Sequence, residues 1–354
     1  MSRFSLLAVA GLVSALLFVD AVSHLQAQTI RKFDAPNTAN TMPSAINIAG
    51  QVTGAADLNG FLRQPDGRFV IFNASPNSRT TPYSINSAGE IVGSYTLNDV
   101  EAFLRDPDGS IVTFPVDNES TQEILPSSGS CALGGGDSEA LAVNDWREVT
   151  GAYSGPGGGC DGFLRQPDGE MITFLLPSLS HPNEIPIGQP QAINFFGQIA
   201  GFYIENNGLK QIGGFIRQPN GNIDRFFVPN STNTVPTGIN VCGQIAGYYT
   251  TTNFTTRGFL RQPDGTFITF NIKGSKDTEA NAINDVGEIT GSYVGQDGVT
   301  RGFIRQSNGI LTTFDVAGAQ GTFAQSINLF GQIVGYFFDG THYHGFIRTP
   351  YWVF

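Results

Sequence analysis

The sequence predicts an all-β protein: a seven-bladed β-propeller of four-stranded antiparallel blades, with the last blade closed by the N-terminal strand. Three observations lead to this prediction. A pattern built on Ile-Asn recurs seven times, with its asparagines 39 to 58 residues apart. Each copy holds short β-branched and aromatic runs separated by turn residues. The last copy lacks its final strand, and a matching segment lies at the N-terminus.

The first half of each repeat is an Asn-x-x-Gly turn followed by a strand that carries a second glycine. Arg147 replaces the turn glycine in the third copy, and Gln or Glu follows that position every time. An asparagine side chain can bond nearby backbone and glycine accepts positive φ, so this segment predicts a tight turn between the first two strands. The asparagines are Asn47, Asn86, Asn144, Asn194, Asn240, Asn284 and Asn328.

The second half of each repeat is Phe-[Leu/Ile]-Arg, then Pro-Asp-Gly or a close variant, then a run that ends on phenylalanine. Pro-Asp-Gly is typical of a short hairpin connection, which gives a third and a fourth strand. We expect each Gln or Glu to pair with the arginine of its own blade across adjacent strands. Repeats begin near residues 43, 82, 140, 190, 236, 280 and 324. The arginines are Arg63, Arg105, Arg165, Arg217, Arg261, Arg305 and Arg348.

The two ends of the chain predict how the ring closes. The seventh repeat stops after Phe346-Ile347-Arg348 without a hairpin glycine. Residues 29–35 match a fourth strand, with Phe33 as the seventh copy of its phenylalanine. Pairing of this strand in the last blade would leave no open sheet edge there. Residues 351–354 could compete for the place, but they are few and lack the turn.

Residues 1–27 are expected to be a signal peptide. Arg3 precedes the uncharged, mostly apolar stretch Phe4–Val19, which is shorter than the roughly 18–20 residues that span a bilayer. Cleavage after Ala27 is favoured, Ala21 offers a second site, and an uncleaved anchor is the alternative. The mature chain, residues 28–354, is then one propeller domain, secreted or periplasmic in a bacterium, with no membrane span.

Composition narrows the classes of partner. The chain of 354 residues has 14% charged residues, 44 glycines and a formal net charge of −11. Nucleic acid and anionic membranes both require a cationic surface, so neither is expected as a partner. A monomer is expected.

The repeat resembles the bacterial extracellular repeat family named for a His-Ala-Phe triplet, which also carries Ile-Asn-x-x-Gly-x-[Ile/Val]-x-Gly. His344-Gly345-Phe346 comes nearest to the triplet, and Ala102-Phe103 matches its last two residues. The arginine after Phe-Leu departs from the family pattern. The resemblance implies an extracellular address and propeller-type repeats, and it implies no chemistry.

Cysteine positions predict one disulfide. Cys131 lies in the connection that enters the third blade, and Cys160 lies between the second and third strands of that blade. Both connections belong to the same face of a propeller, so a bond between them is expected in an oxidising compartment. Cys242 lies in an Asn-x-x-Gly turn on the opposite face and is expected to be unpaired.

The face that carries the variable connections is the predicted binding face, because function on repeat scaffolds usually lies where loops vary over a rigid frame. Its polar groups outside the repeat pattern are Glu119, Glu123, Asp137, Glu139, His181, Glu184, Glu205, Lys210, His342, Tyr343 and His344. The expected ligand-binding set is His181, Glu184, Glu205, Lys210, His342, Tyr343 and His344. His342 and His344 could face one side of a strand, but no third ligand is evident, so neither a metal nor a cofactor is predicted.

The sequence favours a non-catalytic exported module that binds a glycan or a protein through this face. Every prominent residue is used seven times, and no catalytic signature is present, so no catalytic residue is assigned and an enzyme is the less expected outcome. The alternative is a secreted carbohydrate-active enzyme, a hydrolase or lyase with Glu184 and Glu205 as paired carboxylates. A structural or matrix protein is the third hypothesis. Clustering of those acids with His181 around one central pocket would favour the enzyme.

Overall fold

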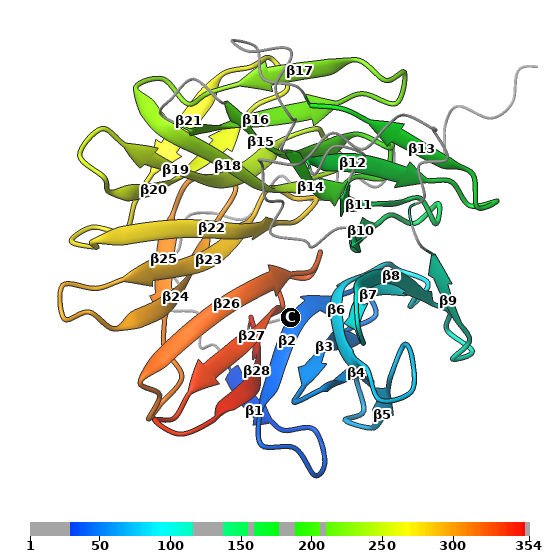
Figure 1. Cartoon of the computed structure of the whole chain (residues 1–354). Helices are drawn as coiled ribbons and strands as arrows, with labels where there is room; N and C mark the ends of the chain where they lie inside the picture. The colour runs from blue at the N-terminus through cyan, green and yellow to red at the C-terminus, as the bar shows by residue number, and fades with distance from the viewer. Residues whose placement is uncertain are drawn as a thin grey trace, which may run out of the picture.

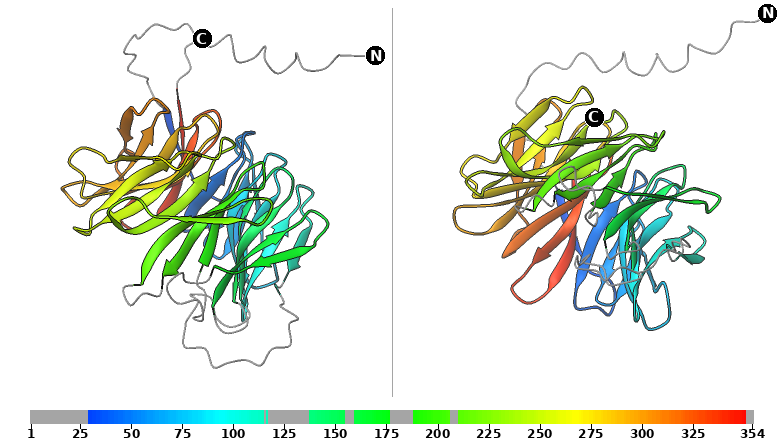
Figure 2. Two further views of the ribbon diagram at one scale, coloured as in Figure 1. Left: turned by 90° about the horizontal axis from the view of Figure 1, so that it is seen from above. Right: turned by 45° about the horizontal axis from the view of Figure 1, so that its top comes forward.

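The computed structural model describes residues 29–114, 116, 137–154, 159–176, 188–205 and 210–350. It is an all-β protein in which seven four-stranded antiparallel sheets follow one another around a ring (Figure 1). Figure 2 shows the same seven sheets from two further directions. The predicted seven-bladed propeller is confirmed. The described part of the chain contains no helix that is long and apolar enough to cross a membrane.

The first four blades each take four consecutive strands. Blade 1 has β2 (Thr41–Ile46), β3 (Val52–Ala56), β4 (Asn59–Arg63) and β5 (Phe69–Phe72). Blade 2 has β6 (Arg79–Ile85), β7 (Ile91–Thr96), β8 (Val100–Arg105) and β9 (Ile111–Phe114). Blade 3 has β10 (Ser138–Val143), β11 (Val149–Ser154), β12 (Cys160–Arg165) and β13 (Met171–Phe174). Blade 4 has β14 (Gly188–Ile193), β15 (Ile199–Glu205), β16 (Gln211–Arg217) and β17 (Ile223–Phe226).

The remaining blades follow the same plan until the last strand. Blade 5 has β18 (Ser231–Ile239), β19 (Ile245–Thr251), β20 (Thr256–Arg261) and β21 (Phe267–Phe270). Blade 6 has β22 (Asp277–Ile283), β23 (Ile289–Val294), β24 (Thr300–Arg305) and β25 (Leu311–Phe314). Blade 7 has β26 (Gly321–Ile327), β27 (Ile333–Phe338), β28 (Tyr343–Thr349) and β1 (Thr29–Phe33). The first strand of each blade contacts the first strands of both neighbouring blades, so these seven inner strands form the inner wall of the ring.

Strand β1 closes the ring, as the sequence predicted. It pairs antiparallel with β28, with Phe33 opposite Gly345 and Thr29 opposite Thr349 (Figure 1). Inner strand β26 of the same blade then contacts β2 of blade 1. The outer strand of blade 7 therefore comes from the start of the described chain, and the other three strands come from its end.

A phenylalanine in the third strand of each blade fills the space between blades. All seven are completely buried, and the side chain of Phe103, for example, meets Phe72 of the preceding blade edge-on with ring centroids 6.1 Å apart. The second strand leaves room for this ring only because it carries glycine. A Cβ on Gly93 would lie 2.2 Å from the carbonyl oxygen of Thr81 and 2.7 Å from the ring of Phe103.

The seven repeated arginines stack on aromatic rings. Each guanidinium carbon lies 4.8–5.3 Å from the centre of the last-strand phenylalanine of the preceding blade, as Arg105 does over Phe72. The predicted pairing of each arginine with the Gln or Glu of its own blade is wrong. Each Gln or Glu instead accepts a hydrogen bond from the turn asparagine four residues before it. The arginines thus join neighbouring blades by cation–π contact.

The turn asparagines form a closed ring of hydrogen bonds. The side-chain Nδ2 of each one donates to the backbone carbonyl of the next asparagine at 3.0–3.2 Å, and Asn328 donates to Asn47 to complete the circle. Each Oδ1 accepts the backbone N–H of the residue four positions on, and the Oδ1 atoms of Asn144, Asn194 and Asn328 also accept the backbone N–H two positions on, as the turn pattern predicted. The asparagines are only 1–5% exposed. Their amides are therefore fully bonded inside the protein.

Arg147, which replaces the turn glycine of the repeat, compensates for two acidic residues of the preceding blade. In blade 1, Gln51 donates to Gln64 at 3.0 Å, whereas blade 2 has Glu90 and Asp106 at the two corresponding positions. Arg147 occupies the turn-glycine position of blade 3 with φ of 63° and forms ion pairs with both acids. Its hydrogen bonds hold the pKa of Asp106 below the usual range. A positive φ is unfavourable for arginine, and the two ion pairs offset this backbone strain.

We expect Arg147→Gly to lower the free energy of unfolding by about 1–3 kcal/mol at pH 7, although glycine suits the turn, because Glu90 and Asp106 then repel each other. The folded-state pKa of Asp106 is lowered, so its stabilising contribution is present above about pH 4 and is lost as the pH falls. Denaturant unfolding should therefore show a smaller difference at pH 3.5.

The matched control rebuilds the pattern of blade 1. Combining Arg147→Gly with Glu90→Gln and Asp106→Gln should restore wild-type stability at both pH values. A single Arg147→Gly variant that is more stable than the wild type at pH 7 would contradict this account.

Candidate functional site

The two faces of the ring differ in their connections. Turns between the first and second strands and between the third and fourth strands lie on one face, here the turn face. Connections between the second and third strands and between successive blades lie on the other, here the variable face. A cavity of about 340 Å³ lies between blades 6 and 7 at the variable face. Its lining residues are Asp277, Glu279, Asn281, Ser292, Tyr293, Val294, Thr300, Phe323, Gln325 and Tyr336.

Side chains at alternate positions of the inner strands provide most of the polar residues that line the cavity. In β22, Thr278 and Ala280 are fully buried. Glu279 lies between them and Asn281 follows Ala280, and both of these side chains keep solvent exposure. In β26, Phe323 and Gln325 occupy the same two positions and are partly exposed. Side chains at alternate positions of a strand share one face of the sheet. These positions therefore present a different pair of side chains from each blade, unlike the repeated residues around them.

Two aromatic rings form one wall of the cavity. Phe323 and Tyr336 are directly opposite on β26 and β27, and their rings stack with centroids 5.0 Å apart and planes 22° from parallel. Tyr343, a predicted site residue, meets Tyr336 edge-on at 5.5 Å. Burial, then the neighbouring Tyr343, raises the pKa of Tyr336. Tyr343 thus supports the aromatic wall from outside the cavity.

The lining from blade 6 includes two acids, Asp277 and Glu279. Burial, and then the nearby charge of Asp277, raise the pKa of Glu279. Asp277 accepts the backbone N–H of Thr256 from blade 5 at 2.8 Å, which fixes the position of its carboxylate. No Lys, Arg or His is among the residues that line this cavity in the described part of the chain.

Amide and hydroxyl groups at the floor are fixed by bonds between the two blades. The side chain of Asn281 donates to the carbonyl of Ala324 at 2.7 Å, and Ser292 Oγ accepts the N–H of Ala324 at 3.1 Å. Both contacts tie blade 6 to the inner strand of blade 7. The floor is therefore preorganised, because its polar groups are held before any ligand enters.

A second acid occupies the equivalent place in blade 3 and is partly exposed. Glu139 lies at the position of Glu279 in its inner strand and accepts a hydrogen bond from the hydroxyl of Tyr83 at 3.3 Å. Burial raises the pKa of Glu139, and burial with the adjacent Glu139 raises that of Tyr83 to about 12. The negative charge that raises the pKa of Glu139 further is that of Asp137 and not that of Glu279. The two glutamates, three blades apart, therefore do not behave as one coupled carboxylate pair.

Several predicted site residues lie outside the described residues or at their boundary. These are His181, Glu184, the side chain of Glu205, and also Glu119 and Glu123. Lys210 precedes β16, is exposed and has φ of 49°. The paired-carboxylate hypothesis for Glu184 and Glu205 stays a prediction.

Of the three cysteines, two lie among the described residues and one lies outside them. Cys242 is free and exposed in a turn, as the sequence predicted. Cys160 is buried at the start of β12, whereas Cys131 lies outside the described residues, so their bond stays a prediction.

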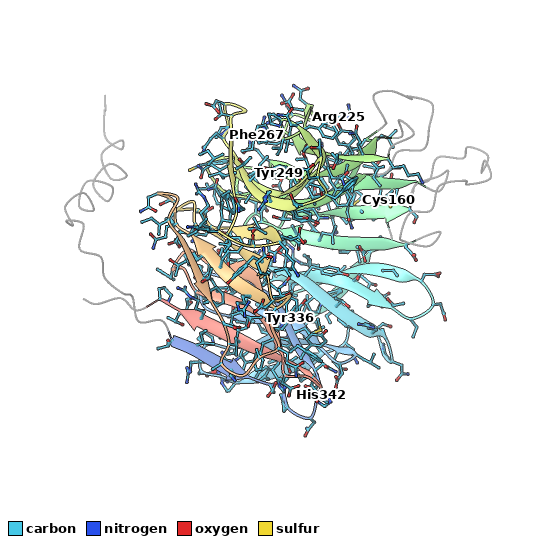
Figure 3. All side chains as sticks on the ribbon, turned by 90° about the vertical axis from the view of Figure 1, so that its left-hand side faces the viewer. Cys160, Arg225, Tyr249, Phe267, Tyr336 and His342 are labelled. Atoms are coloured by element: carbon cyan, nitrogen blue, oxygen red, sulfur yellow. The ribbon has the colours of Figure 1, made fainter. Side chains whose placement is uncertain are left out.

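The two C-terminal histidines have separate surroundings. His344 places its ring between two carboxylates, with Nδ1 2.7 Å from Asp34 and Nε2 3.0 Å from Asp339. His342 is exposed, and its backbone N–H donates to Asp339 at 2.8 Å. Figure 3 shows His342 at the edge of the molecule, separated from Tyr336. Within the described residues, no three His, Cys, Asp or Glu side chains are arranged to hold a metal ion.

His344 joins the closing strand to its blade. Asp34 follows β1, and Asp339 lies in the connection between β27 and β28. Partial burial lowers the pKa of His344, but its hydrogen bonds to the two carboxylates outweigh this, and the net pKa is raised. Lys32 adds two contacts in the same region: its Nζ donates to Ala317 at 2.7 Å and lies 4.8 Å from the centre of the Phe337 ring.

We expect His344→Gln to destabilise the protein by about 1 kcal/mol at pH 5.5 and to have little effect at pH 9. The folded-state pKa of His344 is raised, so its stabilising contribution is complete below about pH 6.5 and is lost as the pH rises through the folded-state value. Thermal unfolding at both pH values measures the difference. His342→Gln is the matched control, and an equal effect of the two substitutions would contradict the proposed role of His344.

Asp161 is a buried acid that the sequence analysis did not single out. It is 3% exposed in β12, opposite Tyr153, and one of its carboxylate oxygens has no hydrogen-bond partner in the part of the chain that the structure describes. Burial raises the pKa of Asp161 to about 7. Its charged form therefore opposes folding at neutral pH.

Asp161→Asn should stabilise the protein increasingly as the pH rises, by a further amount on the order of 3 kcal/mol between pH 4 and pH 8. The unfolded carboxyl ionises near pH 4 and the folded one near pH 7, so only the wild type loses stability across this interval. Asp168→Asn is the control, because Asn220 and Asn308 already occupy that turn position in other blades. A pH-independent effect of Asp161→Asn would refute this interpretation.

An apolar surface surrounds the central opening on the turn face. The two variable residues of the Asn-x-x-Gly turns include Trp146, Phe195, Phe196 and Phe330, which are 41–60% exposed. A cavity of about 190 Å³ at this opening is lined by residues that include the turn asparagines Asn47, Asn86, Asn144 and Asn194. The turn pattern did not predict this surface, because the pattern indicates backbone geometry and leaves its two middle residues free to vary.

Comparisons with known proteins support the fold. No protein-family model matches the chain, and no curated protein does. Among solved structures, a streptogramin B lyase is 12% identical over 92% of this chain and 98% of its own, with a TM-score of 0.61. A catalytically inactive virginiamycin B lyase from Staphylococcus aureus, solved with quinupristin, is 14% identical over 91% and 99%, with a TM-score of 0.55.

A third solved structure adds to this comparison. The β-propeller domain of the Trilobed protease from Pyrococcus furiosus is 12% identical over 88% of this chain and 97% of its own, with a TM-score of 0.55. At such identities the likeness concerns the fold alone.

Proposed function

We propose that this chain is an exported, non-catalytic β-propeller that binds a glycan in the cavity between blades 6 and 7. The observation that carries the proposal is the stacked pair Phe323 and Tyr336 beside fixed amides and carboxylates. A sugar ring has an apolar C–H face and a polar edge of hydroxyl groups. An aromatic wall suits the first and a polar floor suits the second.

The dimensions and polarity of the cavity support a sugar rather than an apolar ligand. Its volume of about 340 Å³ is at the lower end of the range for small-molecule sites. Asn281, Ser292 and Gln325 add amides and a hydroxyl to the lining that also holds the stacked rings. A short segment of a polysaccharide chain fits this combination better than a hydrophobic metabolite does.

The cellular context belongs to the same proposal. Residues 1–27 direct export and are removed, and the mature propeller acts as a monomer in the periplasm or outside the cell. A bond between Cys131 and Cys160 ties the connection entering blade 3 to that blade. Nucleic acid and anionic membranes are not its partners, because the net charge of −11 repels both.

A carbohydrate-active hydrolase or lyase is the second candidate, and one observation favours it. Glu279 lies in the cavity with a raised pKa, which is the property that general acid catalysis requires of a carboxyl. The same cavity holds Asp277 as a second acid. The likeness to lyases under 25% identical adds no argument, because it concerns the fold alone.

Binding of an oligosaccharide panel to the mature protein tests the proposal. A ligand present at about 100 times its Kd should add about 2.7 kcal/mol of stability, which thermal unfolding detects readily. Tyr336→Ala should weaken binding at least about tenfold, because the aromatic platform is lost. Gln325→Ala removes a polar contact from the cavity and provides a second variant whose folding is less at risk.

Phe330→Ala is the matched control, because it removes an exposed aromatic ring from the opposite face. Binding that survives Tyr336→Ala and Gln325→Ala, or a panel without a single ligand, would refute the proposed site. Chromatography of the same mixtures would reveal shortened or unsaturated products, and their loss in Glu279→Gln would establish the enzyme instead.

A further inference from the structure

The charges of the cavity restrict which sugars it can hold. Asp277 and Glu279 are both acidic, and no basic side chain shares the lining within the described residues. Arg301 lies on the neighbouring strand β24, but it is paired with Asp297 at 2.7 Å and Asp315 at 3.5 Å. The described residues therefore provide no ion-pair partner for Asp277 or Glu279.

We propose that this cavity selects a glycan that carries protonated amines, of which an oligomer of glucosamine is the simplest example. The inference rests on the proposed function, because it assigns a substrate class to the same cavity. An ammonium group beside Asp277 and Glu279 would supply the missing positive charge. The C–H face of the same sugar ring would lie on Tyr336 and Phe323.

The position of the two acids in a cavity strengthens this preference, although the side chain of Glu279 keeps solvent exposure. Partial loss of solvation, and then the charge of Asp277, raise the pKa of Glu279, so its ionised form is less favoured than that of an isolated surface carboxylate. A cation that enters the cavity stabilises that form and gains more than it would at a fully hydrated carboxylate. The aromatic rings add attraction for an ammonium group through their faces.

The same charges exclude other sugars. A uronic acid would bring a third carboxylate next to Asp277 and Glu279, and like charges at close range oppose binding. An N-acetylated sugar has the same ring and hydroxyl groups but lacks the positive charge. The comparison between the free amine and its acetylated form therefore isolates the contribution of charge.

Calorimetric titration of the mature protein at pH 6 tests the inference with four tetramers. These are β-1,4-linked glucosamine, N-acetylglucosamine and glucose, and a galacturonate tetramer. The glucosamine tetramer should bind at least about tenfold more tightly than the acetylated one, and the galacturonate should not bind. Glu279→Gln should reduce this preference, and so should raising the salt from 0.05 to 0.5 M, because screening weakens charge pairing.

Two controls separate recognition from general attraction, because a protein of net charge −11 attracts any polycation. Glu170→Gln removes one exposed acidic charge from the turn face and should leave the preference unchanged. Spermine carries positive charge without a sugar ring and should bind more weakly than the glucosamine tetramer. Equal losses in Glu279→Gln and Glu170→Gln would overturn the inference.

The remaining outcomes distinguish this inference from the function on which it rests. If the neutral or acetylated tetramer binds as tightly as the glucosamine tetramer and Tyr336→Ala abolishes both, the glycan site stands and the selection for amines is refuted. If no tetramer binds, the glycan-binding function fails, and the inference fails with it.

Discussion

The closed ring of asparagine hydrogen bonds is the constraint on which the rest of the propeller depends. Among the described strands, the contacts between blades join neighbours around the ring, so small errors in the angle between blades would accumulate around seven of them. The Nδ2 donation from one turn to the next fixes that angle at the inner end of each blade, and stacking of arginine on phenylalanine fixes it farther out. A buried amide that lost its acceptor would cost about 1–3 kcal/mol, which explains the uniformity of these positions. Residues committed to this function in every blade are not available to form a unique site.

The repeat made the fold predictable. One pattern that occurs seven times indicates the number of strands in a blade, the positions of the turns and the number of blades. The incomplete seventh copy and the segment around Phe33 even indicated how the ring closes. The same pattern misled where the partner of a side chain lies in another blade. Gln51 and Arg63 start and end neighbouring strands at the same edge, so pairing within the blade looked natural, but Arg63 stacks on Phe33 of blade 7. Spacing within one repeat does not indicate which group of a neighbouring blade a side chain contacts.

The cavity was not predictable to the same degree. Its walls combine β22, β23 and β24 of blade 6 with β26 and β27 of blade 7, and no local motif joins Glu279 to Tyr336. Of the predicted site residues whose side chains the structure describes, Tyr343 contacts this region through Tyr336, whereas His344 bonds to Asp34 beside the closing strand. A signal was nevertheless present in the sequence. Once the copies are aligned on their asparagines, the inner-strand position of Glu279 holds Met42, Thr81, Glu139, Gln189, Val235 and Phe323 in the others, and such variability inside a strict repeat marks a surface free to specialise.

Closure by β1 also determines when the molecule can become complete during its synthesis. Its partner β28 ends at Thr349, so β1 is made first and waits for almost the whole chain before it can pair. At about 5–20 residues per second this delay amounts to roughly 15–60 seconds. Throughout that interval a strand with unsatisfied backbone groups is open to pairing with other chains. The adjacent charges of Arg31 and Lys32 discourage such association, since neighbouring copies would bring like charges together. The residues that later fasten the ring thus also protect the nascent chain while the ring is still open.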